Sequence, residues 1–185
     1  MMKQRHRADD LERRRWQNPE AIMTAIGIHA GMTFIDAGCG EGYFALPAAR
    51  KVGTNGKVFA FDIDADAISI LKGHAADEGL TNLSAEVGTA EESQPCRRCA
   101  DFVFFGINLH DFANPMKAIT NATVMLKSSG RLIDLDWKAI PMDFGPPAGK
   151  RFPEDKARDL IAAAGLRILS VQDAGPWHYL IIAGL

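Results

Sequence analysis

The chain contains the stretch Phe34-Ile35-Asp36-Ala37-Gly38-Cys39-Gly40-Glu41-Gly42-Tyr43, in which three glycines stand two residues apart between an apolar run and a helical pattern. Glycine adopts positive φ without steric cost and lets the backbone come close to a ligand, and the helix that follows offers free N–H groups. This stretch therefore predicts a strand, a ligand-binding turn and a helix in direct succession.

The same alternation of strand-like and helical segments continues to the end of the chain. The strands are short continuous apolar runs, as expected where helices cover both faces of a parallel sheet. The last two are joined by the short connection 173–176, which suits only antiparallel neighbours. The sequence thus predicts an α/β fold, a doubly wound, Rossmann-like sheet ending in a hairpin. We expect strands at 33–37, 57–62, 83–87, 102–106, 130–136, 166–172 and 177–183, and helices at 43–51, 65–78, 115–126 and 153–164.

Length and composition bound the class of protein. A chain of 185 residues with 47% hydrophobic side chains is long enough for one buried core but short for two. Lys+Arg 21 and Asp+Glu 23 nearly cancel, and no apolar stretch approaches the roughly 20 residues that span a bilayer. We therefore expect one cytoplasmic domain over residues 1–185 with a small-molecule partner and neither nucleic acid nor membrane. A homodimer is left open.

Two familiar glycine motifs fit the turn poorly. A dinucleotide-binding turn has the pattern G-x-G-x-x-G, but Tyr43 stands where its third glycine would be, and no P-loop Gly-Lys-Ser/Thr follows. Asp62 ends the next strand, where a carboxylate can accept hydrogen bonds from both ribose hydroxyls of a nucleoside. Asp36 adds a negative charge that suits an ammonium or sulfonium group. These residues favour S-adenosylmethionine as cofactor over NAD, so a nicotinamide-dependent oxidoreductase is disfavoured.

At these residues the chain resembles the class I S-adenosylmethionine-dependent methyltransferases. Ile35–Gly42 is similar to their first motif, Val58–Asp64 to the acidic second motif and Gly88–Glu91 to the adenine-side loop, while 100–110 and 126–132 are similar to the later motifs. Within that superfamily the chain most resembles the small type 11 proteins related to quinone-biosynthesis methyltransferases. The resemblance implies a seven-stranded, mostly parallel sheet in the order 3-2-1-4-5-7-6 with strand 7 antiparallel.

The resemblance also implies which residues bind the cofactor. Asp36 and the backbone of the three glycines would hold the methionine moiety, Asp62 the ribose, and Ile63 would flank the adenine. Thr89 stands where the family often has an acidic residue that accepts from the adenine amino group. The implied cofactor-binding residues are Asp36, Gly38, Gly40, Gly42, Tyr43, Asp62, Ile63, Thr89, Ala90 and Gly106.

Methyl transfer from a sulfonium depends on alignment, so a general base is optional. His110 is the candidate base, because it follows the fourth strand at the ligand-binding edge and imidazole titrates near neutral pH. The alternative is a histidine that caps or hydrogen-bonds the loop. Trp137 and Lys138 begin the loop 137–152, which we expect to act as a lid, and both are candidates for the acceptor pocket. Trp137 packed beneath that loop is the alternative.

For the N-terminal segment 1–30, which carries the basic stretch 13–15, the flanking acidic residues favour a solvated helix. The functional alternative is a helical cover over the cofactor, with Trp16 as part of it. Cys96 and Cys99 have the spacing of half a zinc site without a second pair, so we expect surface-loop thiols and no metal site. A thiolate site shared with Cys39 stays open.

The sequence therefore predicts an S-adenosylmethionine-dependent methyltransferase that transfers a methyl group to a small-molecule acceptor. The alternative is a non-catalytic S-adenosylmethionine-binding module or sensor, which is motivated by Thr89 and by the absence of a recognisable acceptor site. The motifs do not name the acceptor atom.

Overall fold

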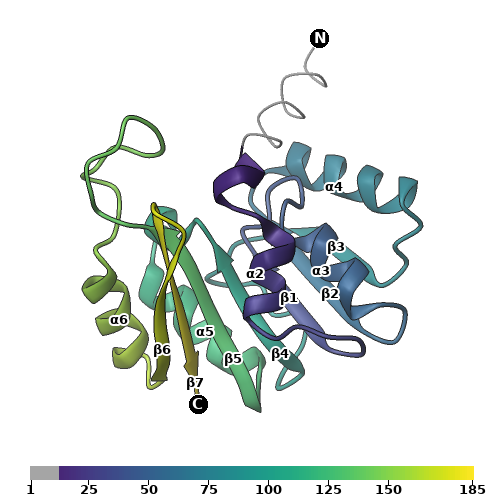
Figure 1. The fold of residues 1–185 in the computed structure, drawn as a ribbon. Helices are drawn as coiled ribbons and strands as arrows, with labels where there is room; N and C mark the ends of the chain where they lie inside the picture. The colour runs from purple at the N-terminus through teal and green to yellow at the C-terminus, as the bar shows by residue number, and fades with distance from the viewer. Residues whose placement is uncertain (1–12) are drawn as a thin grey trace.

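The strands of residues 13–185, the part of the chain that the computed structural model describes, form one sheet in the order β3-β2-β1-β4-β5-β7-β6 (Figure 1). The neighbours from β3 through β5 are parallel, and β7 runs antiparallel to both β5 and β6. The order and the antiparallel last strand are thus confirmed. The strands are β1 (Thr33–Ala37), β2 (Lys57–Asp62), β3 (Leu83–Val87), β4 (Ala100–Gly106), β5 (Leu126–Trp137), β6 (Arg167–Ala174) and β7 (His178–Gly184).

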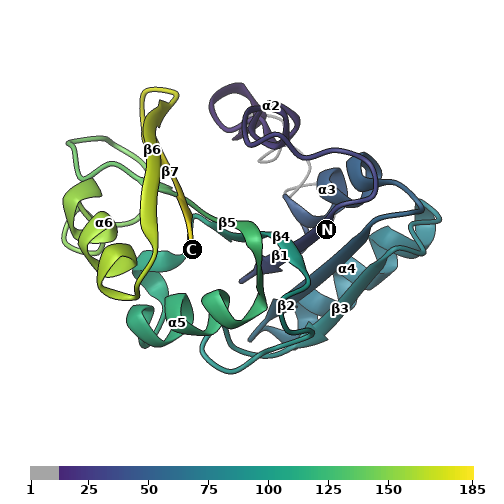
Figure 2. The same cartoon turned by 90° about the horizontal axis from the view of Figure 1, so that it is seen from below.

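Helices cover both faces of this sheet (Figure 2). One core packs α2, α3 and α4 against side chains such as Phe34, and the other packs α5 and α6 against side chains such as Ile35. Neighbouring residues of a strand serve opposite cores because successive side chains point to opposite faces. The helices are α2 (Pro19–Ala25), α3 (Ala45–Val52), α4 (Ala65–Asp77), α5 (Pro115–Met125) and α6 (Glu154–Ala163), with a 3-10 turn η1 (Leu109–Asp111).

Local capping explains where two of these helices begin. The Asp64 carboxylate accepts from the N–H groups of the first turn of α4, and the Asn114 side chain accepts from Lys117 N at 2.9 Å at the start of α5. Pro115 follows as the first residue of α5, where its missing N–H costs nothing. Both caps lie at the edge of the sheet where β2 and β4 end, so they also fix the loops of that edge.

Most boundaries lie within two residues of the prediction, and two of the differences have a clear local cause. The helix expected from Tyr43 begins at Ala45, because Gly42 has φ +93° and its N–H donates to Cys39 O at 3.0 Å, which prolongs the turn. The fifth strand begins at Leu126 rather than Gly130. Leu126 pairs with Ala100 at the start of β4, so the polar residues that follow it continue the sheet.

Cys96 and Cys99 form a disulfide, so the expectation of free surface thiols is wrong. Both pack against the core under α5 and α6, whereas Cys39 is a buried free thiol in the other core. The three sulfurs therefore do not converge. Within residues 13–185, no group of three or more His, Cys, Asp or Glu side chains is arranged to hold a metal ion. No helix in that range is long and apolar enough to cross a membrane.

Candidate active site

The glycine turn lies at the carboxyl ends of the central strands. Gly38, Gly40 and Gly42 all have positive φ, at +77°, +52° and +93°, as the sequence predicts. The N–H groups of Gly38 and Cys39 both donate to Phe61 O, at 2.8 and 3.1 Å, which ties the turn to β2. The turn is therefore rigid on its β2 side and presents its backbone to the space above.

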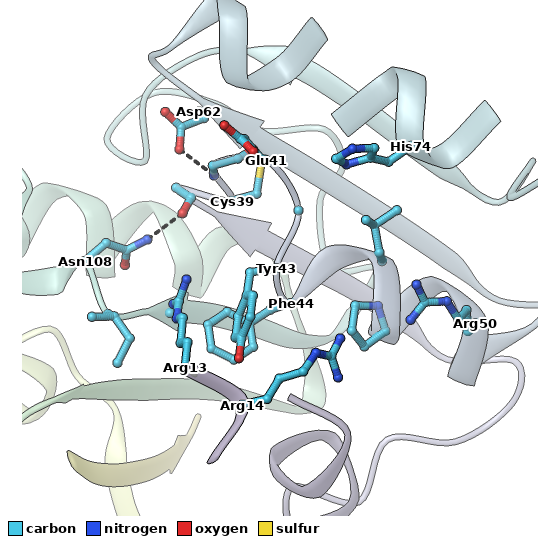
Figure 3. A pocket seen from close by; sticks show the side chains of 17 residues that line it. Arg13, Arg14, Cys39, Glu41, Tyr43, Phe44, Arg50, Asp62, His74 and Asn108 are labelled. Carbon is cyan, nitrogen blue, oxygen red and sulfur yellow. Dashed lines mark hydrogen bonds between the residues drawn. The ribbon is translucent and has the colours of Figure 1, made fainter. Parts of the chain in front are cut away.

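That space is a cleft of about 400 Å³ between the turn, the ends of β2 and β4, and the N-terminal segment (Figure 3). It brings together most of the residues that the sequence assigns to the cofactor. Those that line it are Gly38, Gly40, Gly42, Tyr43, Asp62 and Gly106. The cleft also has lining residues that the sequence analysis missed, among them Arg13 and Asn108.

Asp62 faces the cleft from the end of β2 with its carboxylate already oriented. Its Oδ2 accepts from Gly40 N at 2.8 Å and its Oδ1 accepts from Asp64 N at 3.0 Å. A carboxylate has about four lone-pair sites, so each oxygen can accept a further hydrogen bond from a ligand hydroxyl. The pairing with Gly40 thus joins the predicted ribose-binding group to the predicted methionine-binding turn.

Asp36 lies beneath the turn rather than in the cleft wall. It is 1% exposed, and neither carboxylate oxygen has a hydrogen-bond partner at normal geometry within residues 13–185. Burial, followed by the charge of Asp62, raises the pKa of Asp36 to about 8, although the Ala45 N–H and the Arg13 guanidinium act in the opposite direction. A cationic ligand above the turn would favour the ionised form.

The adenine-side residues do not line the cleft. Ile63 is 75% exposed just beyond Asp62, and Ala90 is buried in the core under α5. Gly88 N donates to Asp62 O at 2.9 Å, which places their loop beside the end of β2, and Thr89 Oγ1 is buried without a hydrogen-bond partner in the described chain. Cofactor contacts by Ile63, Thr89 and Ala90 remain predictions.

Asn108 is the site residue that sequence reasoning missed most clearly. Its Nδ2 donates to Ala37 O at 2.7 Å and to Gly38 O at 2.9 Å, so one amide braces the end of β1 and the start of the turn. Its Oδ1 is buried and meets no hydrogen-bond partner in residues 13–185. Ile107 before it has φ +67°, which is strained for a β-branched residue and typical of functional loops. The one sequence feature that could have pointed to Asn108 is its position just after β4.

The N-terminal segment is attached to the glycine turn through Tyr43. The Tyr43 hydroxyl donates to Gln17 O at 2.6 Å, and the Arg13 guanidinium lies 3.8 Å above the centre of the Tyr43 ring. Residues 13–16 are helical and lead into α2. Residues 1–12 of the predicted cover lie outside the described part of the chain.

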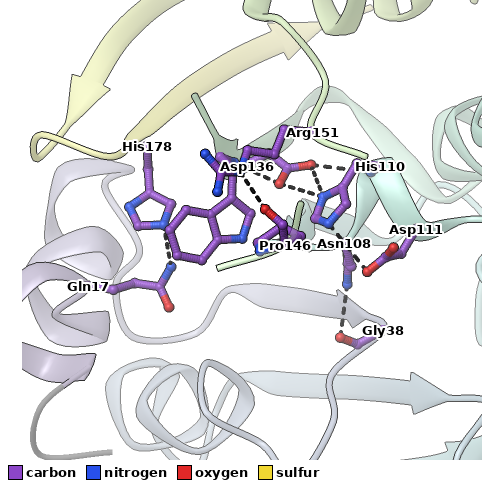
Figure 4. Close-up of polar contacts among 10 residues, drawn as sticks. Gln17, Gly38, Asn108, His110, Asp111, Asp136, Pro146, Arg151 and His178 are labelled. Carbon is purple, nitrogen blue, oxygen red and sulfur yellow. Dashed lines mark hydrogen bonds and ion pairs between the residues drawn. The ribbon is translucent and has the colours of Figure 1, made fainter. Parts of the chain in front are cut away.

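His110 is held between two carboxylates in η1 (Figure 4). Its Nδ1 lies 2.7 Å from Asp136 Oδ1, and its Nε2 lies 3.3 Å from Asp111 Oδ2. Burial lowers the pKa of His110, but the Asp136 hydrogen bond and charge, with Asp111, outweigh it, so the pKa is raised. The side chain is 2% exposed and does not line the cleft, so this geometry fits the loop-bonding alternative, and the role of base stays a prediction.

Trp137 packs beneath the loop that follows it, as the alternative to an acceptor contact predicts. Its ring centre lies 4.3 Å from that of His178, 5.6 Å from Trp16 and 5.9 Å from Phe144. Lys138 forms an ion pair with Asp173 on β6 at 2.6 Å. Neither Trp137 nor Lys138 lines the cleft, so a direct contact of either with an acceptor stays a prediction.

The four rings of Trp16, Trp137, Phe144 and His178 form an aromatic cluster where the N-terminal segment meets the loop 137–152. His178 is fully buried within it and stacks on Trp16 with an interplanar angle of 8°. Burial, then the charge of Arg13 and a weaker effect of Lys138, lower the pKa of His178 to about 4, against a raising effect of the Ala174 backbone. The N-terminal segment and the loop 137–152 therefore touch each other through neutral aromatic side chains.

Arg151 holds the loop 137–152 in shape from its far end. Its guanidinium donates to Pro146 O and Ile140 O at 2.7 Å and to Phe144 O at 3.0 Å, and the residue is 6% exposed. The buried Arg151 guanidinium thus holds the loop 137–152 in a defined conformation.

Comparison with known proteins identifies relatives of this chain. A family model described as a methyltransferase domain matches residues 28–152. A demethylmenaquinone methyltransferase of Oceanobacillus iheyensis is 26% identical over 114 residues, which are 62% of this chain and 48% of the relative. Aklanonic acid methyltransferase DauC of Streptomyces sp. (strain C5) is 31% identical over 102 residues, 55% of this chain and 46% of the relative. The matches thus span about half of the length of these curated relatives.

A solved structure is similar over nearly its whole length. The crystal structure of a SAM-dependent methyltransferase from Aquifex aeolicus superposes with a TM-score of 0.90 at 25% identity, covering 96% of this chain and 95% of that one. The described fold, including the hairpin at the sheet edge, is therefore shared with a chain of similar size.

Proposed function

The chain belongs to the family of methyltransferase domains, and from this premise we propose that it transfers a methyl group from S-adenosylmethionine to a small-molecule acceptor. The observation that carries the proposal is the glycine turn, whose positive-φ backbone is joined to the Asp62 carboxylate through the 2.8 Å bond from Gly40 N. The nucleoside and amino-acid parts of the cofactor need these two features side by side.

The residues of the cleft fit this cofactor. Asp62 offers acceptors for ribose hydroxyls, and the turn offers backbone close to the ligand without side chains in the way. The buried Asp36 beneath the turn favours a positive charge above it. A volume of about 400 Å³ falls within the range of small-molecule sites.

The cofactor supplies an electrophilic methyl group on a cationic sulfur. The protein's part is to align the acceptor with that methyl and to exclude water, since alignment can offset roughly 7–11 kcal/mol of barrier. The aromatic cluster supports a water-excluding role for the N-terminal segment and the loop 137–152. For His110 to accept a proton from the acceptor, its Nε2 must leave Asp111 while Asp136 keeps holding Nδ1.

The relatives support the choice of a small acceptor, because their names specify demethylmenaquinone and aklanonic acid. The neutral, aromatic character of the cluster between the N-terminal segment and the loop 137–152 supports an acceptor with a flat, apolar part. We therefore extend the proposal to compounds of this kind, such as phenols and hydroquinones.

Isothermal titration tests cofactor binding. We expect S-adenosylmethionine and S-adenosylhomocysteine to bind at micromolar concentration or tighter. Asp62→Ala should weaken both by roughly ten- to a hundredfold, because it removes charge-assisted hydrogen bonds. Asp66→Ala on the exposed first turn of α4 is the matched control and should change neither. No binding of either ligand by folded wild-type protein would refute the proposal.

Turnover is tested separately from binding. We expect S-adenosylhomocysteine to form when the protein is mixed with S-adenosylmethionine and a panel of phenols, hydroquinones and amines. Tight cofactor binding with no product across the whole panel would instead favour the non-catalytic binding module.

A further inference from the structure

The segment 88–99 connects the edge of the sheet that holds the cleft to the opposite edge, and it contains no helix. It leaves β3 at the carboxyl ends of the parallel strands and enters β4 at their amino ends. The disulfide between Cys96 and Cys99 closes its last four residues, because Ala100 is already the first residue of β4. Long connections without regular structure are commonly functional in a compact domain. This connection joins a pair of sulfurs to the loop predicted to lie beside the adenine.

Hydrogen bonds to α5 hold this segment at two places. The Asn121 side chain donates to two carbonyls of its first half, at 2.9 and 2.8 Å. The backbone N–H groups of Arg98 and Cys99 donate to carbonyls at the end of α5, at 3.1 and 2.9 Å. The disulfide therefore adds a covalent link to a segment that the fold already positions, so opening it leaves the sheet and α5 in place.

Arg98 lies inside the ring that the disulfide closes, and its backbone has a conformation that arginine rarely adopts. Its φ is +48°, in the left-handed region that glycine favours. A side-chain-bearing residue stays in this region only where the surrounding structure imposes it. The disulfide ring is the covalent constraint on Arg98, so opening the ring lets the strain relax and favours the dithiol form.

The two sulfurs are also accessible and adjacent to positive charges. Cys96 and Cys99 are half-buried, whereas Arg97 and Arg98 between them are exposed. Both arginines line a cleft of about 950 Å³, which gives an external thiol room to approach. Neighbouring cations lower the pKa of a thiol, and a cysteine with a lowered pKa leaves more readily when its disulfide is attacked. The pair therefore has the surroundings of a reactive disulfide.

We propose that Cys96 and Cys99 are a redox-active pair that exchanges with a dithiol reductant, and that their oxidation state controls the conformation of the segment 88–99. A thiolate of the reductant attacks one sulfur, the Cys96–Cys99 bond breaks, and the other cysteine leaves as a thiolate that takes up a proton. The second thiol of the reductant then resolves the mixed disulfide. Two electrons and two protons pass to the two cysteines, and the reductant becomes a disulfide.

The first residues of the segment link this exchange to the cofactor cleft. Gly88 N donates to Asp62 O at 2.9 Å, and Thr89 follows directly, so the segment begins beside the residue predicted to bind the ribose. The disulfide form holds this loop against the end of β2, and the dithiol form loosens it. The cofactor therefore binds more tightly to the disulfide form, and this step alone rests on the proposed function.

The redox equilibrium is measured in mixtures of reduced and oxidised dithiothreitol, by alkylation of free thiols and mass spectrometry. We expect the pair to be half reduced where the oxidised reagent exceeds the reduced one by about tenfold or more. Arg98→Gly should shift the equilibrium toward the disulfide by about fivefold or more relative to Arg97→Gly, because glycine adopts positive φ without strain. Arg97→Gly is the matched control, since it removes the same charge from a residue without positive φ.

The effect on conformation is measured by hydrogen–deuterium exchange of the disulfide form and of the form kept reduced in dithiothreitol. We expect reduction to speed deuterium uptake in the segment 88–99 and to leave the strands unchanged. Titration calorimetry should show S-adenosylhomocysteine binding the reduced form more weakly by about fivefold or more. The double variant Cys96→Ser with Cys99→Ser should match the reduced form with and without dithiothreitol, which excludes an effect through Cys39. If that variant does not fold, wild type in its two states still decides.

A pair that stays oxidised at equal concentrations of reduced and oxidised dithiothreitol would overturn the inference, and so would equal deuterium uptake in both states. Equal shifts in Arg98→Gly and Arg97→Gly would overturn the role of Arg98. Equal affinity of both states for S-adenosylhomocysteine would overturn the link to the cofactor. Failure of wild type to bind S-adenosylhomocysteine and S-adenosylmethionine in either state would be the failure of the proposed function instead, and the thiol and deuterium measurements would still decide the rest.

Discussion

The Nδ1 atom of His110 lies 2.7 Å from Oδ1 of Asp136, and this contact joins the loop after β4 to the end of β5. The same buried carboxylate accepts from the backbone N–H of Trp137 at 2.7 Å and faces the N–H of His110 at 3.3 Å. One side chain thus ties the loop that follows β4 to the end of β5.

Asp136→Asn should lower the pKa of His110, because it removes the carboxylate that raises it against the effect of burial. In wild type, the raised folded-state pKa stabilises the fold fully below the unfolded value near 6.5 and loses that effect as pH rises through the folded value. NMR titration of the His110 ring measures its pKa, and urea unfolding at pH 5.5 and 8.5 measures how stability depends on pH. Asp111→Asn, at the exposed partner, should give a smaller shift in the same direction. An unchanged His110 pKa in Asp136→Asn would contradict the assignment.

Binding of S-adenosylmethionine should release about one proton near pH 7, because Asp36 is mostly protonated below its raised pKa of about 8 and a cationic ligand favours its ionised form. Calorimetry in two buffers of different ionisation enthalpy counts the protons. The Asp36→Asn variant should release fewer protons when it binds S-adenosylmethionine. Binding of 5′-methylthioadenosine, which carries no positive charge, should release no protons from wild type. Equal proton release by wild type and Asp36→Asn would show that another group titrates.

Asp134→Asn should stabilise the protein at pH 8 relative to wild type. Asp134 is fully buried without a hydrogen-bond partner for either oxygen in residues 13–185, and burial, then the charge of Asp136, raise its pKa well above the usual range. An acid with a raised folded pKa loses stability as pH rises from about 4 toward that value, by at most about 1.4 kcal/mol per pH unit. Urea unfolding of both proteins at pH 5 and pH 8 measures the difference in their free energies of unfolding. A difference that is the same at both pH values would argue against a protonated Asp134.

Arg151→Ala should loosen the loop 137–152 without unfolding the sheet. It removes three charge-assisted hydrogen bonds to loop carbonyls, each worth about 1.5–3 kcal/mol, so amide protection there should fall by about tenfold or more. Hydrogen–deuterium exchange followed by peptide mass spectrometry resolves the loop from the strands. Lys150→Ala, at the exposed neighbour, is the control and should leave the exchange unchanged.

Sequence reasoning found the parts of the site that depend on backbone and on position along a strand. The glycine turn and Asp62 follow from a strand, a turn and a second strand end, so their meeting in one cleft could be predicted from spacing. Arg13 and Asn108 could not be assigned this way. Arg13 reaches the cleft only because Tyr43 holds the N-terminal segment, and the role of Asn108 depends on which carbonyls its amide meets.

The sequence by itself determined the α/β fold and the ligand-binding turn, because hydrophobic period and glycine spacing are local properties of the chain. The strand order followed from the resemblance of its motifs to the class I methyltransferases. Only the tertiary structure decided that His110 is held by Asp136, that Trp137 is buried in an aromatic cluster and that Cys96 pairs with Cys99. The His110 and Trp137 contacts join segments far apart in the chain, and the sequence spacing of Cys96 and Cys99 had favoured surface-loop thiols rather than the disulfide. Their geometry is set by how the sheet stacks the loops at its carboxyl edge and packs the helices on its faces.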